Sequence, residues 1–529
     1  MPATAYVRES DAPNPERIVK EFDRLFAASQ PAFEVMQEIA DYVVPNKAVL
    51  TRQVVPGAEL TERLWHSVGV HSNNLLEASM AGALTSAAVR WFSLKFRHQR
   101  LNDHPAGMRW LQECEERIYL ALRQSNFNAE SGEMYIDMGL GTGALLMKER
   151  AKQVPGFNGL FFKGVPPGSY VIAENPEGDV NRLTRLLRWS GWQITEQFPK
   201  ATLPDDIKGL ITDKPETMHE VLHATYPRRN TNPKRKDSKH MPFASCYVLK
   251  KSKTLLDEGG EEEFPYAVPR WAVTTGEVWG RGPGHTALPD MRTLNGIVEK
   301  TLNAASKAID PPGLVSSDAT MAELDLRAGS QNVVDGDPDK AWRALQSGTN
   351  VQLGELKLAE YRAAIRESFF WDQLTLPGER AMTLGEVERR LELMRRVLGP
   401  TLGRFEHEFL NMLLNRVFNL MLRAGALPPP PREIAGADLD VEYEGPLARS
   451  QKMARVAGFE QFMALLTPLQ PFPALYERAL ENVNLDEAVR DLLDITTGVS
   501  SYKVDIEARD ALRAEKAQAQ AQQAQVEQI

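Results

Sequence analysis

One long helix, bounded by glycine and proline on both sides, constrains the fold of this chain more than any other segment. It is predicted from about Ala287 to Asp310, and Pro311-Pro312-Gly313 ends it. Its apolar side chains form a single stripe at helical spacing, consisting of Met291, Leu294, Val298, Leu302 and Ala305. We therefore expect a helix that buries one face against its neighbours and presents the other.

Most of the sequence after residue 280 is predicted to be helical. A loop region rich in Gly, Ser, Asn and Asp covers about 327–353, and a further helix follows it. Thr383 and Glu386 form a capping box at the start of a very long helical segment. Gly399-Pro400 predicts a kink or a break in that segment, and Gly425 with the proline run after it predicts its end.

Strand signals occur in the first 280 residues. The large apolar residues alternate in RWFSLKF, and further strands are predicted in GLFFKGV, GSYVIAEN, FASCYVLKK and YAVPRWAVT. At the N-terminus, Asn14-Pro15 predicts the start of a helix that continues to about Ser29, and a second helix is expected from Ala32 to Tyr42. The predicted fold class is α+β and mostly helical.

Length and composition limit the class of protein. A chain of 529 residues suggests several domains or one elongated subunit with several parts. The formal net charge of -9 argues against a wholly basic nucleic-acid coat. The only cysteines, Cys114 and Cys246, lie far apart, so neither a disulfide framework nor a zinc site is indicated, and a reducing, intracellular environment is expected. No signal peptide or membrane-spanning pattern is present, which predicts a soluble protein.

The glycine-rich sequence DMGLGTGALLMKE raises the question of a phosphate-binding loop. Gly139, Gly141 and Gly143 follow a short predicted helix that begins near Glu130, so we expect them to continue a helix. The lysine-serine pair of a P-loop is absent, and the glycine spacing differs from the dinucleotide-binding form. We interpret these glycines as positions where another backbone packs closely, with nucleotide binding as the alternative.

The segment from 226 to 263 separates its charges. Its basic residues are Arg228, Arg229, Lys234, Arg235, Lys236 and Lys239, and its acidic group is Asp257, Glu258, Glu261, Glu262 and Glu263. In a ring of subunits, the basic group of one copy could face the acidic group of the next copy. The alternative is a solvated loop followed by a turn.

The sequence contains no pattern typical of an active site. The nine histidines form no metalloprotease pair, and no Gly-x-Ser-x-Gly motif is present. Glu406-His407-Glu408 lies in a long predicted helix, where an exposed charged face is the simpler interpretation. Asp205-Asp206 lacks the third carboxylate of a metal-dependent nuclease. We therefore expect no enzyme activity, no cofactor and no catalytic metal.

Seven motifs follow one another in an order that is specific, although none of them is unique. They are LTSAAVRWFSL (84–94), SNFN (125–128), GTGALL (141–146), GEVWGRGPGHTALPDMRTLN (276–295), ESFFWDQL (367–374), TLGEVERRLE (383–392) and LGPTLGRFEHEFL (398–410). In this order they resemble the head-to-tail connector, or portal protein, of T7-like short-tailed bacteriophages. The resemblance extends from the N-terminal helices to about Arg509.

The resemblance implies an elongated subunit with wing, stem, clip and crown parts. Twelve such subunits would form a ring with a central channel. The wing would comprise 1–190 and 313–400, the stem helices 191–215 and 285–312, the clip 216–284, and the crown with the C-terminal tail 401–529. A channel loop would lie near 327–353. The polar Ala/Gln tail after Leu512 departs from the family pattern; it has high helix propensity and would be ordered only in a bundle of copies.

The resemblance also implies a passive channel for double-stranded DNA of any sequence. Such a channel must avoid base recognition and a strongly basic lining, because each neutralised phosphate would hold the moving duplex. The candidate channel residues are Arg292, Lys300, Lys307, Ser347, Gly348, Thr349 and Asn350. The candidate residues for clip docking or contact between subunits are Arg228, Arg229, Lys234, Arg235, Lys236, Glu261, Glu262 and Glu263.

The partners implied by the resemblance are further copies of the chain, double-stranded DNA, the terminase large subunit, the major capsid and scaffolding proteins and a tail adaptor. Internal core proteins are further possible partners, and no membrane is implied. The expected location is the portal vertex of the virion, with assembly in the host cytoplasm. Two alternatives remain: a helical internal virion core or scaffold protein, and a nucleotide-binding enzyme.

Overall fold

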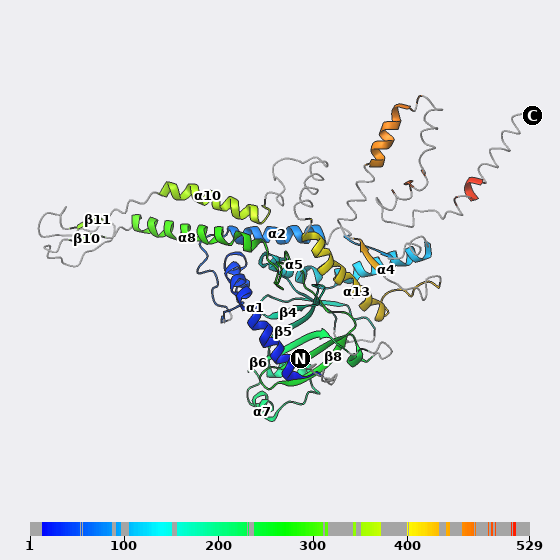
Figure 1. Cartoon of the computed structure of the whole chain (residues 1–529), viewed down its shortest axis with the longest axis horizontal. Helices are drawn as coiled ribbons and strands as arrows, with labels where there is room; N and C mark the ends of the chain where they lie inside the picture. The colour runs from blue at the N-terminus through cyan, green and yellow to red at the C-terminus, as the bar shows by residue number, and fades with distance from the viewer. Residues whose placement is uncertain are drawn as a thin grey trace, which may run out of the picture.

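Two long helices form an arm that projects from a body of further helices and antiparallel sheets in the computed structural model (Figure 1). The structure describes residues 13–52, 54–55, 57–86, 91–96, 105–150, 156–229, 231, 237–309, 313–315, 342–344, 351–371, 399, 401–432, 441–444, 458–469, 471, 485, 488–489, 492, 509 and 511–514.

The helices alternate with short strands along the chain. The helices are α1 (Pro15–Val43), η1 (Pro45–Lys47), α2 (Val68–Leu84), α4 (Pro105–Gln124), α5 (Phe127–Asp137), η2 (Met138–Leu140), α6 (Gly191–Gln197), α7 (Asp205–Asp213), η3 (Ser238–His240), α8 (Pro283–Ile309), α10 (Val351–Ser368), η4 (Glu406–Asn411), α13 (Met412–Arg423) and η5 (Thr467–Leu469). The strands are β1 (Ser93–Phe96), β2 (Leu145–Glu149), β3 (Leu160–Gly164), β4 (Tyr170–Glu174), β5 (Val180–Ser190), β6 (Met218–Pro227), β7 (Phe243–Leu249), β8 (Thr254–Glu261), β9 (Tyr266–Ala267), β10 (Gly313–Val315), β11 (Trp342–Ala344) and β12 (Val441–Glu444). The mixed helix and sheet class predicted from the sequence is confirmed.

A five-stranded antiparallel sheet with the order β4-β5-β6-β7-β8 forms the lower part of the body (Figure 1). Successive residues of its central strand β6 face opposite sides of the sheet. Leu222 and Ala224 pack with Phe22 of α1 on one face, whereas Val221 packs with α6 and α7 on the other. The sheet is therefore covered by helices on both faces.

Residues 191–215 form two short helices, α6 and α7, and not the single stem helix expected there. Ser190 and Gln193 form a capping box at the start of α6. Ile194 of α6 and Ile207 of α7 are buried against the five-stranded sheet. Because the apolar residues of this segment face the sheet, it packs at the opposite end of the body from α8 (Figure 1).

The glycine-rich stretch ends a helix, so the prediction that it continues one is wrong. α5 ends at Asp137, η2 adds one turn, and Gly141 then takes φ 100°. This left-handed conformation stops the helix and directs the chain toward β2. β2 is the middle strand of the sheet β3-β2-β9, which lies over the main core of the body.

α1 is one helix, although two were predicted. Pro31 lies inside it and removes one backbone hydrogen bond. Residues on both sides of Pro31, such as Phe22 and Phe33, are buried, and their packing keeps the helix continuous. The predicted N-cap is confirmed, because the side chain of Asn14 accepts a hydrogen bond from the Arg17 N–H.

Four of the five predicted strand segments form strands of four or more residues, namely β1, β3, β4 and β7, whereas YAVPRWAVT yields only the short β9. The sequence did not predict β2, β5, β6 and β8. β5 carries four arginine or asparagine side chains between its apolar residues, in VNRLTRLLRWS, which obscures the alternation. β1 pairs with β12, so Ser93 lies opposite Glu444 from the C-terminal part of the chain.

The arm consists of α8 and α10, which run antiparallel and side by side (Figure 1). α8 begins at Pro283, earlier than predicted, and Leu358 and Ile365 of α10 are buried in the same core as Leu294 of α8. α8 ends and α10 begins at the end of the arm farther from the body (Figure 1).

The C-terminal part is described in pieces. α13 ends before Gly425, which has φ 71°, as the sequence predicted. Thr383, Glu386 and Pro400 lie outside the described residues, so the predicted capping box and break stay predictions. The tail from residue 515 onward also lies outside them.

Candidate functional site

The inner half of α8 is packed as its apolar stripe predicts, whereas the outer half is exposed in a single copy. Met291 and Leu294 are 3% and 1% exposed. Farther along the helix, Val298 is partly buried, Leu302 is 50% exposed and Ile309 is 85% exposed. The apolar face therefore continues beyond the part that the body and α10 cover.

The candidate channel cations of α8 differ in their surroundings. Arg292 donates from Nε and Nη2 to the carboxylate of Glu38 on α1, and these hydrogen bonds raise the pKa of Arg292. Lys300 is exposed. Lys307 also lies in α8, and the structure does not describe its side chain. Residues 347–350 lie outside the described residues. Of the three cations, Arg292 is thus already held by its own chain.

Charges of the candidate docking segment pair within the chain. Arg228 Nη2 lies 3.2 Å from Glu258 Oε1 and donates to the Gly259 carbonyl at 2.8 Å. The side chain of Arg228 is only 9% exposed, so it is a structural cation between neighbouring segments of the sheet. Arg229 is exposed, and Lys234, Arg235 and Lys236 lie outside the described residues.

Two of the three clustered glutamates bind arginines of α13. Arg416 contacts Glu261 at 2.5 Å and Glu263 at 2.9 Å, and Arg423 contacts Glu263 at 2.5 Å. Burial raises the pKa of Glu263, but the hydrogen bonds and charges of the two arginines outweigh it, and the pKa is lowered. Glu262 is exposed. Glu261 and Glu263 therefore link α13 to the end of β8 in the five-stranded sheet. Of the three glutamates at 261–263, only Glu262 is exposed.

Sequence reasoning missed Arg416, although its position carries a signal. Its side chain is 2% exposed and lies on the buried face of α13 with Leu413 and Val417. A cation on the buried face of an amphipathic helix requires a partner, because an unpaired buried charge is very costly. The sequence could not name Glu261 and Glu263, which lie 155 and 153 residues away.

The glycine motif packs against backbone and has no space for a phosphate. A Cβ atom at Gly141 would collide with the backbone of Gly280 and Gly282. The Gly143 N–H donates to the Pro269 carbonyl at 3.1 Å, and the Gly141 N–H donates to the Met138 carbonyl at 3.0 Å. The close-packing interpretation is confirmed, and these amides are directed to protein carbonyls.

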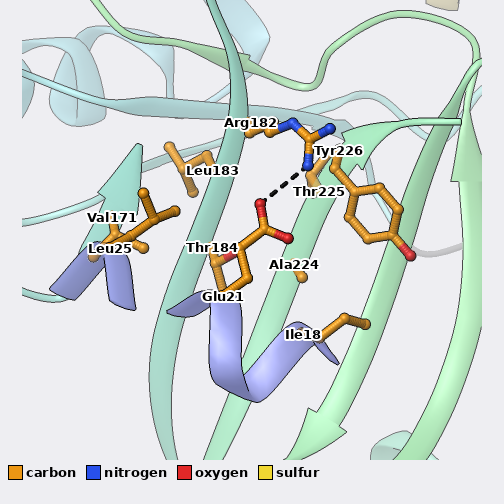
Figure 2. A pocket seen from close by; sticks show the side chains of 10 residues that line it. All are labelled: Ile18, Glu21, Leu25, Val171, Arg182, Leu183, Thr184, Ala224, Thr225 and Tyr226. Atoms are coloured by element: carbon orange, nitrogen blue, oxygen red, sulfur yellow. Dashed lines mark hydrogen bonds and ion pairs between the residues drawn. The ribbon is translucent and has the colours of Figure 1, made fainter. Parts of the chain in front are cut away.

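Three cavities lie among the residues that the structure describes, one small and two open. The cavity between α1 and the sheet has a volume of about 10 Å³, space for a single water, and lies beside Glu21, which accepts a hydrogen bond from Arg182 at 3.0 Å (Figure 2). An open hollow of about 690 Å³ lies beside the first turns of α1, and one of about 780 Å³ lies at the base of the arm, beside Trp271 and His285. Within the described ranges, no three metal-binding side chains cluster. None of the helices in that part of the chain is long and apolar enough to span a bilayer.

Comparison with known proteins gives a family match over most of the chain. The family model "Bacteriophage head to tail connecting protein" matches residues 16–501. The portal protein of Salmonella phage epsilon15 is 28% identical over 525 residues, covering 96% of this chain and 92% of that protein. The probable portal protein of Bordetella phage BPP-1 is 27% identical over 442 residues, covering 81% of this chain and 78% of that protein.

Similar solved structures come from gene transfer agent particles. A chain from the neck of an empty gene transfer agent particle covers 90% of this chain and 98% of its own length, at 13% identity and a TM-score of 0.33. A chain from the native gene transfer agent virion gives the same coverage and identity with a TM-score of 0.31. Scores at this level do not define a common fold.

Proposed function

Because the chain belongs to the family of bacteriophage head-to-tail connecting proteins, we propose that it acts as the portal protein at one vertex of a phage capsid. Double-stranded DNA would pass through the ring that it forms, into the head during packaging and out of it during ejection. The match to residues 16–501 carries this conclusion, because it spans the body, the arm and most of the C-terminal part. The role is structural, and ATP hydrolysis belongs to a partner motor.

The ring would consist of twelve copies, as the family resemblance implies. The exposed apolar residues Leu302 and Ile309 on the outer half of α8 support contact between copies, since exposed apolar faces of this kind are commonly covered in assemblies. A ring repeats one contact between two different surfaces of the subunit. The arm of one copy would then cover the open face of the arm in the next copy.

The arrangement of the helices favours a different assignment of the family's parts from the one expected. We assign the stem to the antiparallel pair α8 and α10, because these are the two long helices that project from the body (Figure 1). In this family the clip lies between the two stem helices, and residues 310–350 take that position here. The five-stranded sheet joins strands from 170–190 and 218–261, so we assign it as one unit to the wing.

The proposed channel surface is the polar side of the arm. Lys300 is exposed on α8, and Lys307 lies two turns farther along the same helix. Repetition around the ring would turn each lysine into a ring of charges with weak, sequence-independent attraction for the phosphate backbone. We do not include Arg292 in the proposed channel surface, because it pairs with Glu38 of its own chain.

The remaining partners follow from the same role. The terminase large subunit and the tail adaptor would dock at the clip, and the major capsid, scaffolding and internal core proteins would contact the body. The protein would assemble in the host cytoplasm and remain at the vertex of the virion.

Electron microscopy of the purified protein tests this proposal. We expect rings with a central hole wide enough for duplex DNA, and filaments or monomers alone would contradict it. A titration with ATP should show no binding at the 139–143 loop, because the Gly141 and Gly143 amides donate to protein carbonyls. Tight nucleotide binding that Gly141→Ala abolishes would favour the enzyme alternative.

A further inference from the structure

Arg270 joins four segments of the body at the base of the arm. Its side chain is 3% exposed and binds the carboxylate of Glu408 in η4, with Nη2 at 2.6 Å from Oε1. The Arg270 backbone N–H also donates to Glu408 Oε2 at 2.8 Å. Further bonds go to the carboxylate of Glu174 in β4 and to the carbonyls of Gly178 and Val278. Arg270 and Glu408 are thus held in one fixed geometry.

Trp271, the next residue, contacts the inner end of the arm. Its ring stacks on Phe370, with a centroid distance of 6.0 Å and an interplanar angle of 29°. Phe370 follows the last turn of α10 and has φ 58°, a conformation that side chains other than glycine rarely adopt. Such a residue persists only where its surroundings hold it in place. The backbone N–H of Trp271 donates to the Gly141 carbonyl at 2.9 Å, which fixes the position of the Trp271 backbone.

Glu408 lies in a wide helical turn. η4, which covers Glu406–Asn411, is a π-helix between the helical residues 401–405 and α13. A π-turn contains one extra residue relative to an α-helix and occurs mostly as a local bulge, frequently at functional positions. A return to α-helical geometry would rotate the residues before the bulge relative to α13. The Arg270–Glu408 contact therefore lies in a turn whose hydrogen-bond pattern differs from that of the helical residues on both sides.

We propose that Arg270 and Trp271 couple the inner end of the arm to η4, so that displacement of α10 at Phe370 alters the pairing of Glu408 and the geometry of the η4 turn. Arg270 and Trp271 are adjacent in the backbone, one holding η4 and the other holding α10. A shift of Phe370 removes the support of the Trp271 ring, and a displacement of the Trp271 backbone is transmitted to the Arg270 N–H one residue earlier, which binds Glu408. The coupling concerns the fold of the subunit and does not rest on the proposed portal function.

Hydrogen exchange of the full-length protein tests the coupling in both directions. Phe370→Gly removes the ring, and glycine adopts φ 58° without strain, so this variant should fold. We expect exchange in 405–417, which Phe370 reaches through Trp271 and Arg270, to accelerate by about tenfold, within the range for coupled sites. Glu408→Gln keeps the shape of the side chain and removes its charge. Because coupling is reciprocal, it should accelerate exchange in 361–371 by a similar factor.

Arg281→Ala is the matched control, because it breaks an exposed pair with Glu277 in the same segment of the chain and should leave both regions unchanged. The proposal is wrong if Phe370→Gly affects only 361–371 and Glu408→Gln affects only 401–417. If Phe370→Gly fails to fold, Trp271→Phe serves instead, since it keeps an aromatic ring while shortening the stack. The chosen variant, Phe370→Gly where it folds and Trp271→Phe otherwise, is then combined with Glu408→Gln. The two effects on exchange should be less than additive, and strict additivity would overturn the coupling.

Discussion

Gly141 combines two requirements that only glycine meets. Its φ of 100° lies in the left-handed region, and a side chain there would collide with Gly280 and Gly282 at the start of the arm. The residue therefore ends the α5–η2 helix and also allows the loop to pack against the base of α8. A motif that suggests nucleotide binding in the sequence is used for contact between two backbones.

Replacing Gly141 by alanine should destabilise the subunit by roughly 1–3 kcal/mol, through overpacking and strain at positive φ. The melting temperature of the purified protein measures this effect. Gly296→Ala in α8 is the control, because a Cβ there meets no atom within 4 Å. That variant should be neutral or more stable by up to about 1 kcal/mol. Equal melting temperatures for Gly141→Ala and the wild type would contradict the packing explanation.

Asp137 makes the stability depend on pH. It accepts a hydrogen bond from Lys47 Nζ at 2.9 Å, but its burial raises its pKa to about 7. Because this folded-state pKa is above the unfolded value of about 3.9, the contribution of Asp137 to stability is present below about pH 4 and is lost as the pH rises to about 7.

Asp137→Asn should therefore reduce the loss of stability between about pH 4 and about pH 7. Melting temperatures across this pH range give the measurement. Glu113→Gln breaks an exposed pair with Arg117. This control should leave the change of melting temperature with pH as in the wild type. If the melting temperature of Asp137→Asn changes with pH as steeply as that of the wild type, another group is responsible for the pH dependence.

At the scale of the elements, α8 and α13 show how one helix serves two purposes. The inner half of α8 is buried, while Leu302 and Ile309 in the outer half are exposed. α13 is buried along its apolar face and also carries Arg416 into that face, where Glu261 and Glu263 neutralise it. Each helix thus links the body to a neighbouring part of the molecule.

Changing both Lys300 and Lys307 to alanine should leave ring formation intact and alter DNA packaging or retention. Loss of the two rings of charge removes sequence-independent attraction for the phosphate backbone and lowers its salt dependence. Packaged DNA per particle and its retention after purification give the readouts. Lys357→Ala on α10, whose amine pairs with Glu360, is the control. Normal packaging and retention in the double variant would exclude these lysines from the channel function.

Arg416→Met should destabilise the subunit by about 3–5 kcal/mol, because it leaves the half-buried Glu261 without its arginine and Glu263 with Arg423 alone. Chemical denaturation measures the loss. A triple variant that also changes Glu261 and Glu263 to glutamine should recover part of it, since the uncompensated charge is then removed. No recovery in the triple variant would mean that the arginine acts by packing alone.

At the scale of the whole molecule, the residues that we assign to the wing, stem and clip differ from those expected from the sequence. The five-stranded sheet combines strands that sequence reasoning had divided between wing and clip. Residues 310–350 stand in the sequence between the two helices of the arm, α8 and α10. The two assignments of the clip, 216–284 and 310–350, make opposite predictions for docking.

Replacing residues 316–341 by a short glycine-serine linker should leave rings intact but abolish docking of the packaging motor or tail adaptor. Reversal of Lys234, Arg235 and Lys236 to glutamate should leave docking close to normal, because those positions stand in the sequence between β6 and β7 and outside the proposed clip. Pull-down of each partner by purified rings gives the measurement. Lost docking in the charge-reversed protein, with normal docking in the linker variant, would restore the original placement of the clip.

The sequence by itself determined what local spacing and motif order can determine. It predicted the apolar stripe of α8, the cap at Asn14, the end of α13 near Gly425 and the family, because each depends on neighbouring residues or on order along the chain. Tertiary structure decided the rest. Whether 191–215 lies on a sheet depends on strands β6 to β8, which the sequence pattern did not fully reveal. Whether Gly141 ends a helix, and which carboxylates hold Arg270 and Arg416, depend on segments 96 to 155 residues apart. Contacts at such separations are selected by packing and charge in the folded chain, and local sequence carries no record of the partner.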